Sequence, residues 1–224
     1  MKPLLSSQRN QALTRVDVII LVVIAVLFAL WMLNNPGGAA IKRRAQRINC
    51  VSNLKQIALS ARIWEGDHGN QYPMSVSVTN GGGREWIATG NIAACFRVMS
   101  NELSATKILI CPADEDRMPA TNFTTGFDNS HIGYFVSLNA SEIYPQQLFM
   151  GDSNLMTNGV PLKSGVVDIS CGGSISWTKA RHRFVGNVSF ADGSVAEESA
   201  LGLENALLCS TNGTPFAYNR YVIP

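Results

Sequence analysis

One long apolar run near the beginning of the chain dominates its hydrophobic pattern. Residues 18–33 carry no charged or amide side chain, and Val16 extends the run toward the N-terminus. Its length approaches the roughly 17–25 residues that a membrane-spanning helix needs. The pattern therefore predicts a helix over residues 14–33 that can cross a membrane, behind a polar leader at residues 1–12.

A second helical stretch follows a break in the pattern. The break falls at residues 34–38, where Pro36 removes an intrahelical hydrogen bond and two glycines loosen the backbone. We therefore assign residues 13–38 to a transmembrane helix with its break and residues 39–66 to a helical spine. Apolar residues three or four apart indicate one buried face of this spine: Ile48, Val51, Leu54 and Ala58.

Residues 67–224 have the short apolar segments and frequent turns of an α+β domain. Strands are expected at residues 72–78, 107–111, 134–138, 147–150, 165–170, 188–191 and 194–197, and a helix is expected within residues 92–104. Asp192-Gly193 is the strongest hairpin signal, because both residues tolerate a positive φ. The predicted fold class is α+β, with the second half of the long N-terminal helix packed on an antiparallel sheet.

The composition of the chain limits the classes of function that it can have. The chain has 224 residues, of which 46% are hydrophobic, so about 190 remain outside the leader and the apolar run, enough for one domain with a core. Its formal net charge of +2 is too small to indicate a nucleic-acid partner. Neither a phosphate-binding loop motif nor a Gly-x-Ser-x-Gly nucleophile motif is present.

The orientation of the apolar run stays open at this point. Basic residues are more numerous after the run than before it, which favours a cytoplasmic C-terminal domain; those after it are Lys42, Arg43, Arg44, Arg47 and Lys55. The five cysteines favour an oxidising compartment instead. A cleaved secretory signal ending near residues 37–40 is an alternative, although its apolar segment would be long for that role.

Several side chains are candidates for chemistry. Asp17 lies just inside the apolar run, where an ionised carboxylate is costly and therefore marks a functional site. No two cysteines have Cys-x-x-Cys spacing, which leaves zinc and thioredoxin-type chemistry without support. His182 lies between two arginines, a context that disfavours a bound cation, and Asp192-Gly193 is first of all a turn.

Three segments in order resemble a known family. They are Ala12-Leu13-Thr14-Arg15-Val16-Asp17, Cys50-Val51-Ser52-Asn53-Leu54-Lys55-Gln56-Ile57 followed later by Ile110-Cys111-Pro112-Ala113-Asp114, and His182 with Asp192-Gly193 after nine intervening residues. Together they resemble pilin-like proteins with a prepilin-type cleavage and methylation segment, and within these the processing-associated subgroup with a His-x9-Asp-Gly motif. Ala12, Leu13 and Asp17 stand where that family usually has glycine, phenylalanine and glutamate.

The resemblance implies a pilin-like fold and a maturation pathway. A prepilin peptidase would cleave after Ala12, Leu13 would become the methylated N-terminus, and Asp17 would pair with the freed amino group of a neighbouring subunit. The implied location is the bacterial inner membrane, spanned once, with the C-terminal domain in the periplasm or outside. The implied partners are the membrane, the peptidase and other pilin-like subunits, with no nucleic acid.

We also predict that Cys50 and Cys111 form a disulfide between the spine and the globular domain; two buried thiols are the alternative. The remaining cysteines leave an odd thiol, and Cys171–Cys209 is a possible second pair beside Cys95. No metal or cofactor is expected, although related pseudopilins sometimes bind calcium, for which Asp152 and Asp192 are weak candidates.

The leading hypothesis is thus a structural, non-enzymatic, pseudopilin-like subunit of a pilus or secretion pseudopilus. The rival is a membrane-anchored extracytoplasmic domain that hydrolyses or binds a ligand such as a carbohydrate, using the region of Asp152 and Asp192. A concave polar pocket with converging carboxylates would favour the rival.

Overall fold

The computed structural model of the chain describes residues 14–33, 37–170 and 172–224. The predicted leader, the cleavage and methylation residues Ala12 and Leu13, and Cys171 lie outside the described residues. The chain divides into two units, residues 1–42 and 43–224, and each is described by itself.

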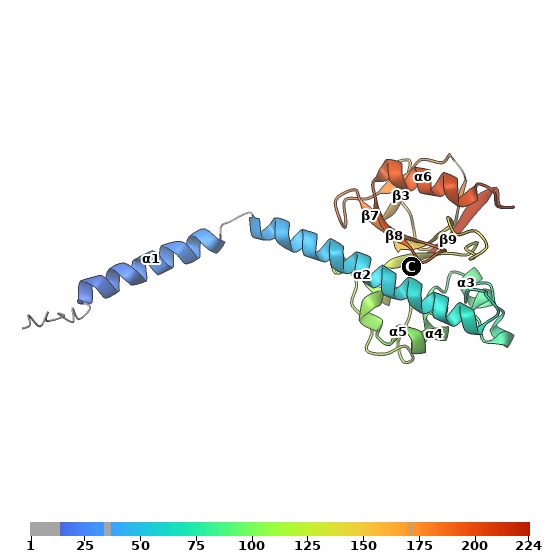
Figure 1. Cartoon of the computed structure of the whole chain (residues 1–224), viewed down its shortest axis with the longest axis horizontal. Helices are drawn as coiled ribbons and strands as arrows, with labels where there is room; N and C mark the ends of the chain where they lie inside the picture. Colours follow the sequence, from blue (N-terminus) through green and yellow to red (C-terminus); the bar gives the residue numbers. More distant parts are fainter. Residues whose placement is uncertain (1–13, 34–36, 171) are drawn as a thin grey trace, which may run out of the picture. The chain divides into compact units, whose positions relative to one another are not determined.

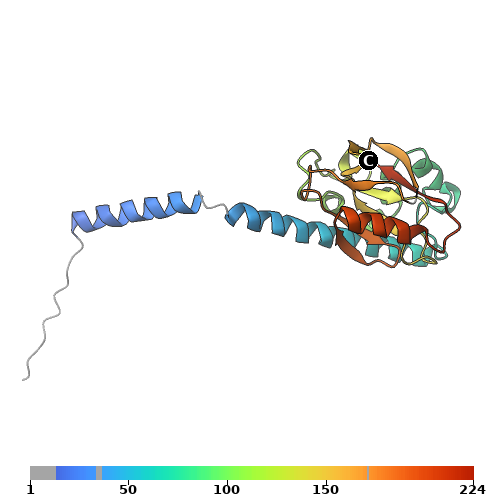
Figure 2. The same ribbon diagram turned by 90° about the horizontal axis from the view of Figure 1, so that it is seen from above.

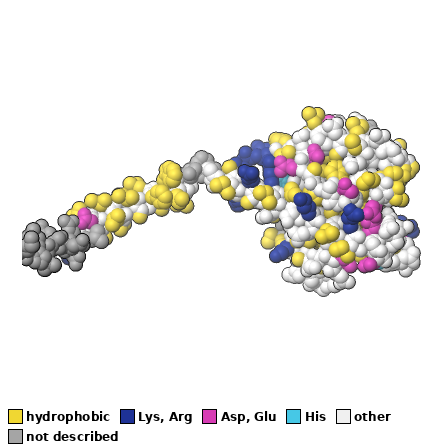
Figure 3. All heavy atoms as spheres, in the orientation of Figure 1, with side chains coloured by type: hydrophobic (Ala, Val, Ile, Leu, Met, Phe, Trp, Pro, Cys, Tyr) yellow, Lys and Arg dark blue, Asp and Glu magenta, His cyan; other side chains and the backbone are white. Residues whose placement is uncertain are grey.

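Helix α1 spans Arg15–Leu33, as predicted, and is long and apolar enough to cross a membrane. At 1.5 Å per residue its 19 residues extend about 28 Å, close to the roughly 30 Å of a bilayer's hydrocarbon core. None of its residues is buried, and its surface is almost entirely apolar (Figure 3). This exposed apolar surface is compatible with a single membrane-spanning helix.

Helix α2 spans Gly37–Asp67 and confirms the predicted spine. Lys and Arg side chains gather on its first part (Figure 3). Its buried face in the second unit differs from the predicted one, because Ile48 is 60% exposed. The buried positions recur at helical spacing from Cys50 onward: Cys50, Leu54, Ile57, Ala58, Ala61 and Trp64.

The second unit contains a six-stranded sheet in the order β5-β9-β1-β2-β7-β8, and every neighbouring pair is antiparallel. Its strands are β1 (Tyr134–Ser137), β2 (Leu148–Asp152), β5 (Gly165–Ser170), β7 (Gly186–Phe190), β8 (Val195–Glu198) and β9 (Tyr218–Ile223). A smaller sheet joins β4 (Val160–Pro161), β3 (Leu155–Thr157) and β6 (Ile175–Trp177). The predicted α+β class with an antiparallel sheet is confirmed.

Helices cover both faces of the large sheet (Figures 1 and 2). On one face, Tyr134 and Val136 share a core with α2 and with α3 (Arg84–Ala88), α4 (Ala93–Val98) and α5 (Ser100–Leu103). On the other face, Phe135 shares a second core with α6 (Ala200–Thr211) and the small sheet. Successive residues of β1 thus face opposite cores, as the two-residue period of a strand requires.

Two predicted strands are wrong. Residues 72–78 form turns that lead into a 3₁₀ helix, η1 (Val78–Asn80), and Thr106–Leu109 form another, η2. The apolar positions in both segments are buried except Val78, which is half-buried, but their backbones pair with no strand among the described residues. Burial therefore produced the apolar pattern without a sheet. A third short 3₁₀ helix, η3, spans Asn129–His131, and the sequence pattern had not indicated α6 or β9.

The predicted hairpin at Asp192-Gly193 is confirmed. It joins β7 to β8, which pair from Gly186 opposite Glu198 to Ser189 opposite Val195. Gly193 has a φ of 85°, in the left-handed region that favours glycine.

Candidate functional site

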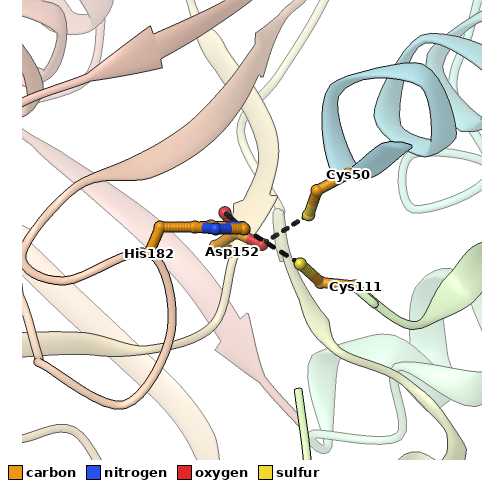
Figure 4. A group of neighbouring side chains, drawn as sticks. All are labelled: Cys50, Cys111, Asp152 and His182. Carbon is orange, nitrogen blue, oxygen red and sulfur yellow. Dashed lines mark hydrogen bonds and ion pairs between the residues drawn. The ribbon is translucent and has the colours of Figure 1, made fainter. Parts of the chain in front are cut away.

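Four chemically reactive side chains meet in the interior of the second unit. Cys50 comes from α2, Cys111 from the segment after η2, Asp152 from the end of β2, and His182 from the loop between β6 and β7. One ligating atom from each lies within 4.8 Å of the other three. Figure 4 shows the four side chains pointing toward one another. We call this group the interior cluster.

Local structure explains each position. Cys50 opens the buried face of α2, one turn before Leu54. Asp152 lies opposite Tyr134 in the β1–β2 ladder, and a carboxylate at the end of an otherwise apolar buried strand is unusual. The loop that carries His182 turns sharply, because the next two residues, Arg183 and Phe184, have φ values of 56° and 64°.

The contacts within the interior cluster are short. The Cys50 thiol donates to Asp152 Oδ1 at 3.3 Å, and Cys111 Sγ lies 3.1 Å from His182 Nε2. His182 Nε2 is also 3.8 Å from Asp152 Oδ2. No member is more than 7% exposed. Burial of so many polar groups is costly unless each has a partner, so the interior cluster is an organised feature of the fold.

A surrounding shell holds the carboxylate in place. Asp152 Oδ2 accepts hydrogen bonds from the backbone N–H of Asn187 at 2.8 Å and from its side-chain amide at 2.9 Å. The buried guanidinium of Arg181 lies 4.0 Å from Asp152 Oδ1, donates to the Gly133 carbonyl at 2.6 Å, and pairs with Asp114. Asp152 is therefore oriented by an amide pair and faces one buried positive charge.

The environment gives the two thiols different pKa values. The neighbouring Cys50 thiol and His182 lower the pKa of Cys111 to about 7, against the opposing effect of burial. Burial, followed by the nearby Cys111 and Asp152, raises the pKa of Cys50. Burial alone would lower the pKa of His182, but its contact with Cys111 and the charge of Asp152 outweigh this and raise it. Cys111 is thus the thiol that ionises more readily.

The predicted disulfide between Cys50 and Cys111 is not formed in the structure, where both are free thiols. The two sulfur atoms nevertheless lie within 4.8 Å of each other. Each sulfur has another polar neighbour instead. Cys50 contacts Asp152 and lies 3.4 Å from the Tyr134 hydroxyl, and Cys111 contacts His182.

The geometry does not fit a catalytic cysteine. A Cys-His-Asp triad needs the thiol and the carboxylate on different ring nitrogens of the histidine. Here Cys111 and Asp152 both approach Nε2 of His182. Cys111 is also fully buried, so a substrate has no access to its sulfur.

The calcium candidates do not share one environment. Asp152 is fully buried within the interior cluster, whereas Asp192 belongs to the β7–β8 turn, where its Oδ1 accepts from the Ser194 N–H at 2.8 Å. Calcium prefers six to eight oxygen ligands, and the ligating partners around Asp152 are two sulfurs and a nitrogen. The donor set at Asp152 therefore does not suit calcium.

The His-x9-Asp-Gly segment runs the length of β7 and contacts α2 at both ends. Arg47 Nη2 donates to the His182 carbonyl at 2.9 Å, and Arg62 donates to the Asp192 carbonyl. Arg47 and Arg62 are separated by about 22 Å along the helix. Each end of the motif thus binds one arginine of α2 through a backbone carbonyl, and the His182 side chain at one end is part of the interior cluster.

Asp17 has a local role in α1. Its carboxylate accepts hydrogen bonds from the Thr14 N–H at 2.9 Å and the Thr14 hydroxyl at 2.7 Å, and its own N–H donates to Thr14 Oγ1 at 3.3 Å. This reciprocal pattern is a capping box at the start of α1. The pairing of Asp17 with a neighbouring subunit stays a prediction.

Sequence reasoning missed how these residues combine. It singled out Cys50 with Cys111, His182 with Asp192, and Asp152 as a weak calcium candidate, but not Arg181 or the interior cluster itself. One available signal was Asp152 at the end of the apolar segment 148–151. No family model, no curated protein and no solved structure matches this chain.

Proposed function

We propose that this chain is a structural, non-enzymatic, pseudopilin-like subunit, anchored in the bacterial inner membrane and assembled with other pilin-like subunits into a pilus or secretion pseudopilus. The observation that carries the proposal is the element order of the described residues. An apolar, fully exposed helix of membrane length is followed by α2, whose second half is built into the core of an antiparallel α+β domain.

The motifs that carry the family resemblance support the same proposal. Processing after Ala12 would leave Leu13 as the methylated N-terminus, two residues before the start of α1. Asp17 would then lie near a positive charge at the same depth in the membrane, and a buried ion pair of this kind sets register because an unpaired charge is costly. The C-terminal domain would lie in the periplasm or outside the cell.

The rival of an extracytoplasmic hydrolytic or carbohydrate-binding domain has weaker support. Its residue Asp152 is fully buried. An open depression lies elsewhere, and the one carboxylate lining it, Glu142, is paired with Arg62 at 2.6 Å. Converging free carboxylates, which the rival requires, are not found among the described residues of that depression.

The experiment is mass spectrometry of the mature N-terminus. The full chain is purified from membranes of cells that contain a prepilin peptidase, and its N-terminal peptide is sequenced. We expect a methylated Leu13 terminus. The small-residue control Ala12→Gly should also be processed, whereas the bulky Ala12→Leu should keep its leader. An intact Met1 terminus on the wild-type protein, or one near Ala40, would contradict the proposal.

A further inference from the structure

We propose that Cys50, Cys111, Asp152 and His182 bind a structural zinc ion that fastens α2 to the sheet. This inference is independent of the proposed function, because it rests on the interior of the second unit alone. It also revises the expectation drawn from cysteine spacing. A zinc site does not need Cys-x-x-Cys when the tertiary fold brings four ligands together.

The donor set is the first argument. Zinc is bound by thiolate sulfur, imidazole nitrogen and carboxylate oxygen, and its structural sites have four such ligands. The interior cluster offers two sulfurs, one nitrogen and one carboxylate. Copper(I) prefers a softer set of thiolates and thioethers, and magnesium and calcium prefer oxygen alone. The mixed set therefore favours zinc.

The spacing of the donor atoms is the second argument. Zinc–ligand bonds of about 2.0–2.3 Å arranged as a tetrahedron place neighbouring ligand atoms about 3.3–3.8 Å apart. The contacts between Cys50 and Asp152, Cys111 and His182, and His182 and Asp152 measure 3.3, 3.1 and 3.8 Å. No pair of ligating atoms in the interior cluster exceeds 4.8 Å. The interior cluster therefore has nearly the size of a zinc coordination shell.

Charge balance is the third argument. Two thiolates, one carboxylate and one Zn²⁺ sum to a single negative charge. The buried guanidinium of Arg181 lies 4.0 Å from Asp152 Oδ1 and also pairs with Asp114, which Arg117 contacts at 3.2 Å. These two guanidinium groups and one carboxylate together supply one positive charge. Asn187 holds the other carboxylate oxygen with two hydrogen bonds, the kind of outer support that orients metal ligands. The basic context of His182, which in the sequence counted against a cation, thus includes Arg181, one of the two arginines that balance the loaded site.

A disulfide accounts for only half of the interior cluster. Joining Cys50 to Cys111 would take both sulfurs away from their present partners and leave the Asp152 carboxylate and the His182 ring buried beside an apolar bridge. A zinc ion uses all four groups. Because all four are buried, the site leaves no open coordination position for a substrate, as in structural rather than catalytic zinc sites.

The full-length protein, purified in detergent and stripped of metal under reducing conditions, tests the proposal. Zn²⁺ titration should reach one ion per chain, and Co²⁺ in its place should give the d–d bands of a tetrahedral site together with a thiolate-to-cobalt charge-transfer band. Zinc should also raise the thermal unfolding midpoint, because a ligand of the folded state stabilises it. These wild-type measurements do not depend on whether any variant folds.

Matched variants locate the site. Cys50→Ser, Cys111→Ser, Asp152→Ala and His182→Ala should each lose the stoichiometric binding, whereas Cys95→Ser, a buried cysteine outside the interior cluster, and the exposed Cys209→Ser should keep it. Any of three outcomes would overturn the proposal. They are wild-type protein that takes up no metal, a cobalt spectrum without thiolate bands, and native protein whose alkylation pattern shows a Cys50–Cys111 disulfide.

Discussion

At the level of single residues, buried charged side chains in this protein differ in their hydrogen-bond partners. Asp152 and Arg181 are surrounded by partners, whereas Glu65 is only 2% exposed and its Oε1 has no hydrogen-bond partner among the described residues. Burial and then the nearby Glu142 carboxylate raise the pKa of Glu65. The charged form of Glu65 is therefore disfavoured in the folded protein.

We predict that Glu65→Gln stabilises the protein at neutral pH. A carboxyl group whose pKa is raised on folding costs stability once the pH exceeds its folded pKa, and this cost disappears toward the ordinary glutamate pKa of 4.5. The variant should thus gain about 1 kcal/mol in free energy of unfolding at neutral pH. Urea unfolding across the pH range should show the gain shrinking as the pH falls toward that value. The exposed Glu115→Gln serves as control, and a gain independent of pH would count against the explanation.

Among the elements, α6 shows how packing on the second face of the sheet is organised. Ser199 caps it by accepting a hydrogen bond from the Gly202 N–H at 3.1 Å. Leu203 and Leu207, one turn apart, are both 1% exposed and belong to the core that contains Phe135. The neighbouring Leu208 is 47% exposed.

This contrast gives a matched pair of substitutions. Leu207→Ala should lower the free energy of unfolding by about 2–5 kcal/mol, because it removes a buried side chain and leaves a cavity. Leu208→Ala should cost less than about 1 kcal/mol. Chemical denaturation of the two variants in the same detergent measures the difference. Equal losses would mean that α6 does not pack on the sheet as described.

At the scale of the whole molecule, the proposed function requires the second unit to lie outside the cytoplasm, and its cysteines allow a test. Cys209 on α6 is an exposed free cysteine, whereas Cys50, Cys95 and Cys111 are buried. In a Cys171→Ser background, Cys209 is therefore a single accessible site for a thiol reagent that does not cross membranes.

We predict that this reagent labels Cys209 in intact spheroplasts of a Gram-negative host, as an extracytoplasmic domain requires. Omitting the reagent or replacing Cys209 with serine should abolish the labelling. Labelling that appears only after lysis would place the domain in the cytoplasm. That result would favour the orientation indicated by the basic residues after α1 over the one implied by the family resemblance.

Local signals along the chain were sufficient for part of its linear organisation. An uninterrupted apolar run specifies α1, helical spacing specifies most of α2, and Asp192-Gly193 specifies the β7–β8 turn, because each depends on neighbouring residues and on backbone preferences. The same signals misplaced the strands at residues 72–78 and 107–111, since burial of apolar side chains does not require a backbone paired in a sheet.

The interior cluster was decided by tertiary structure. Its members come from a helix, two loops and a strand end, and Cys50 and Asp152 are 102 positions apart in the sequence. The spacing of these residues in the sequence does not predict their proximity, because strand pairing and the packing of α2 in the core beside β1 and β2 bring these segments together. The sequence supplied ligands of the right chemistry, and the fold supplied their distances, burial and compensating charge.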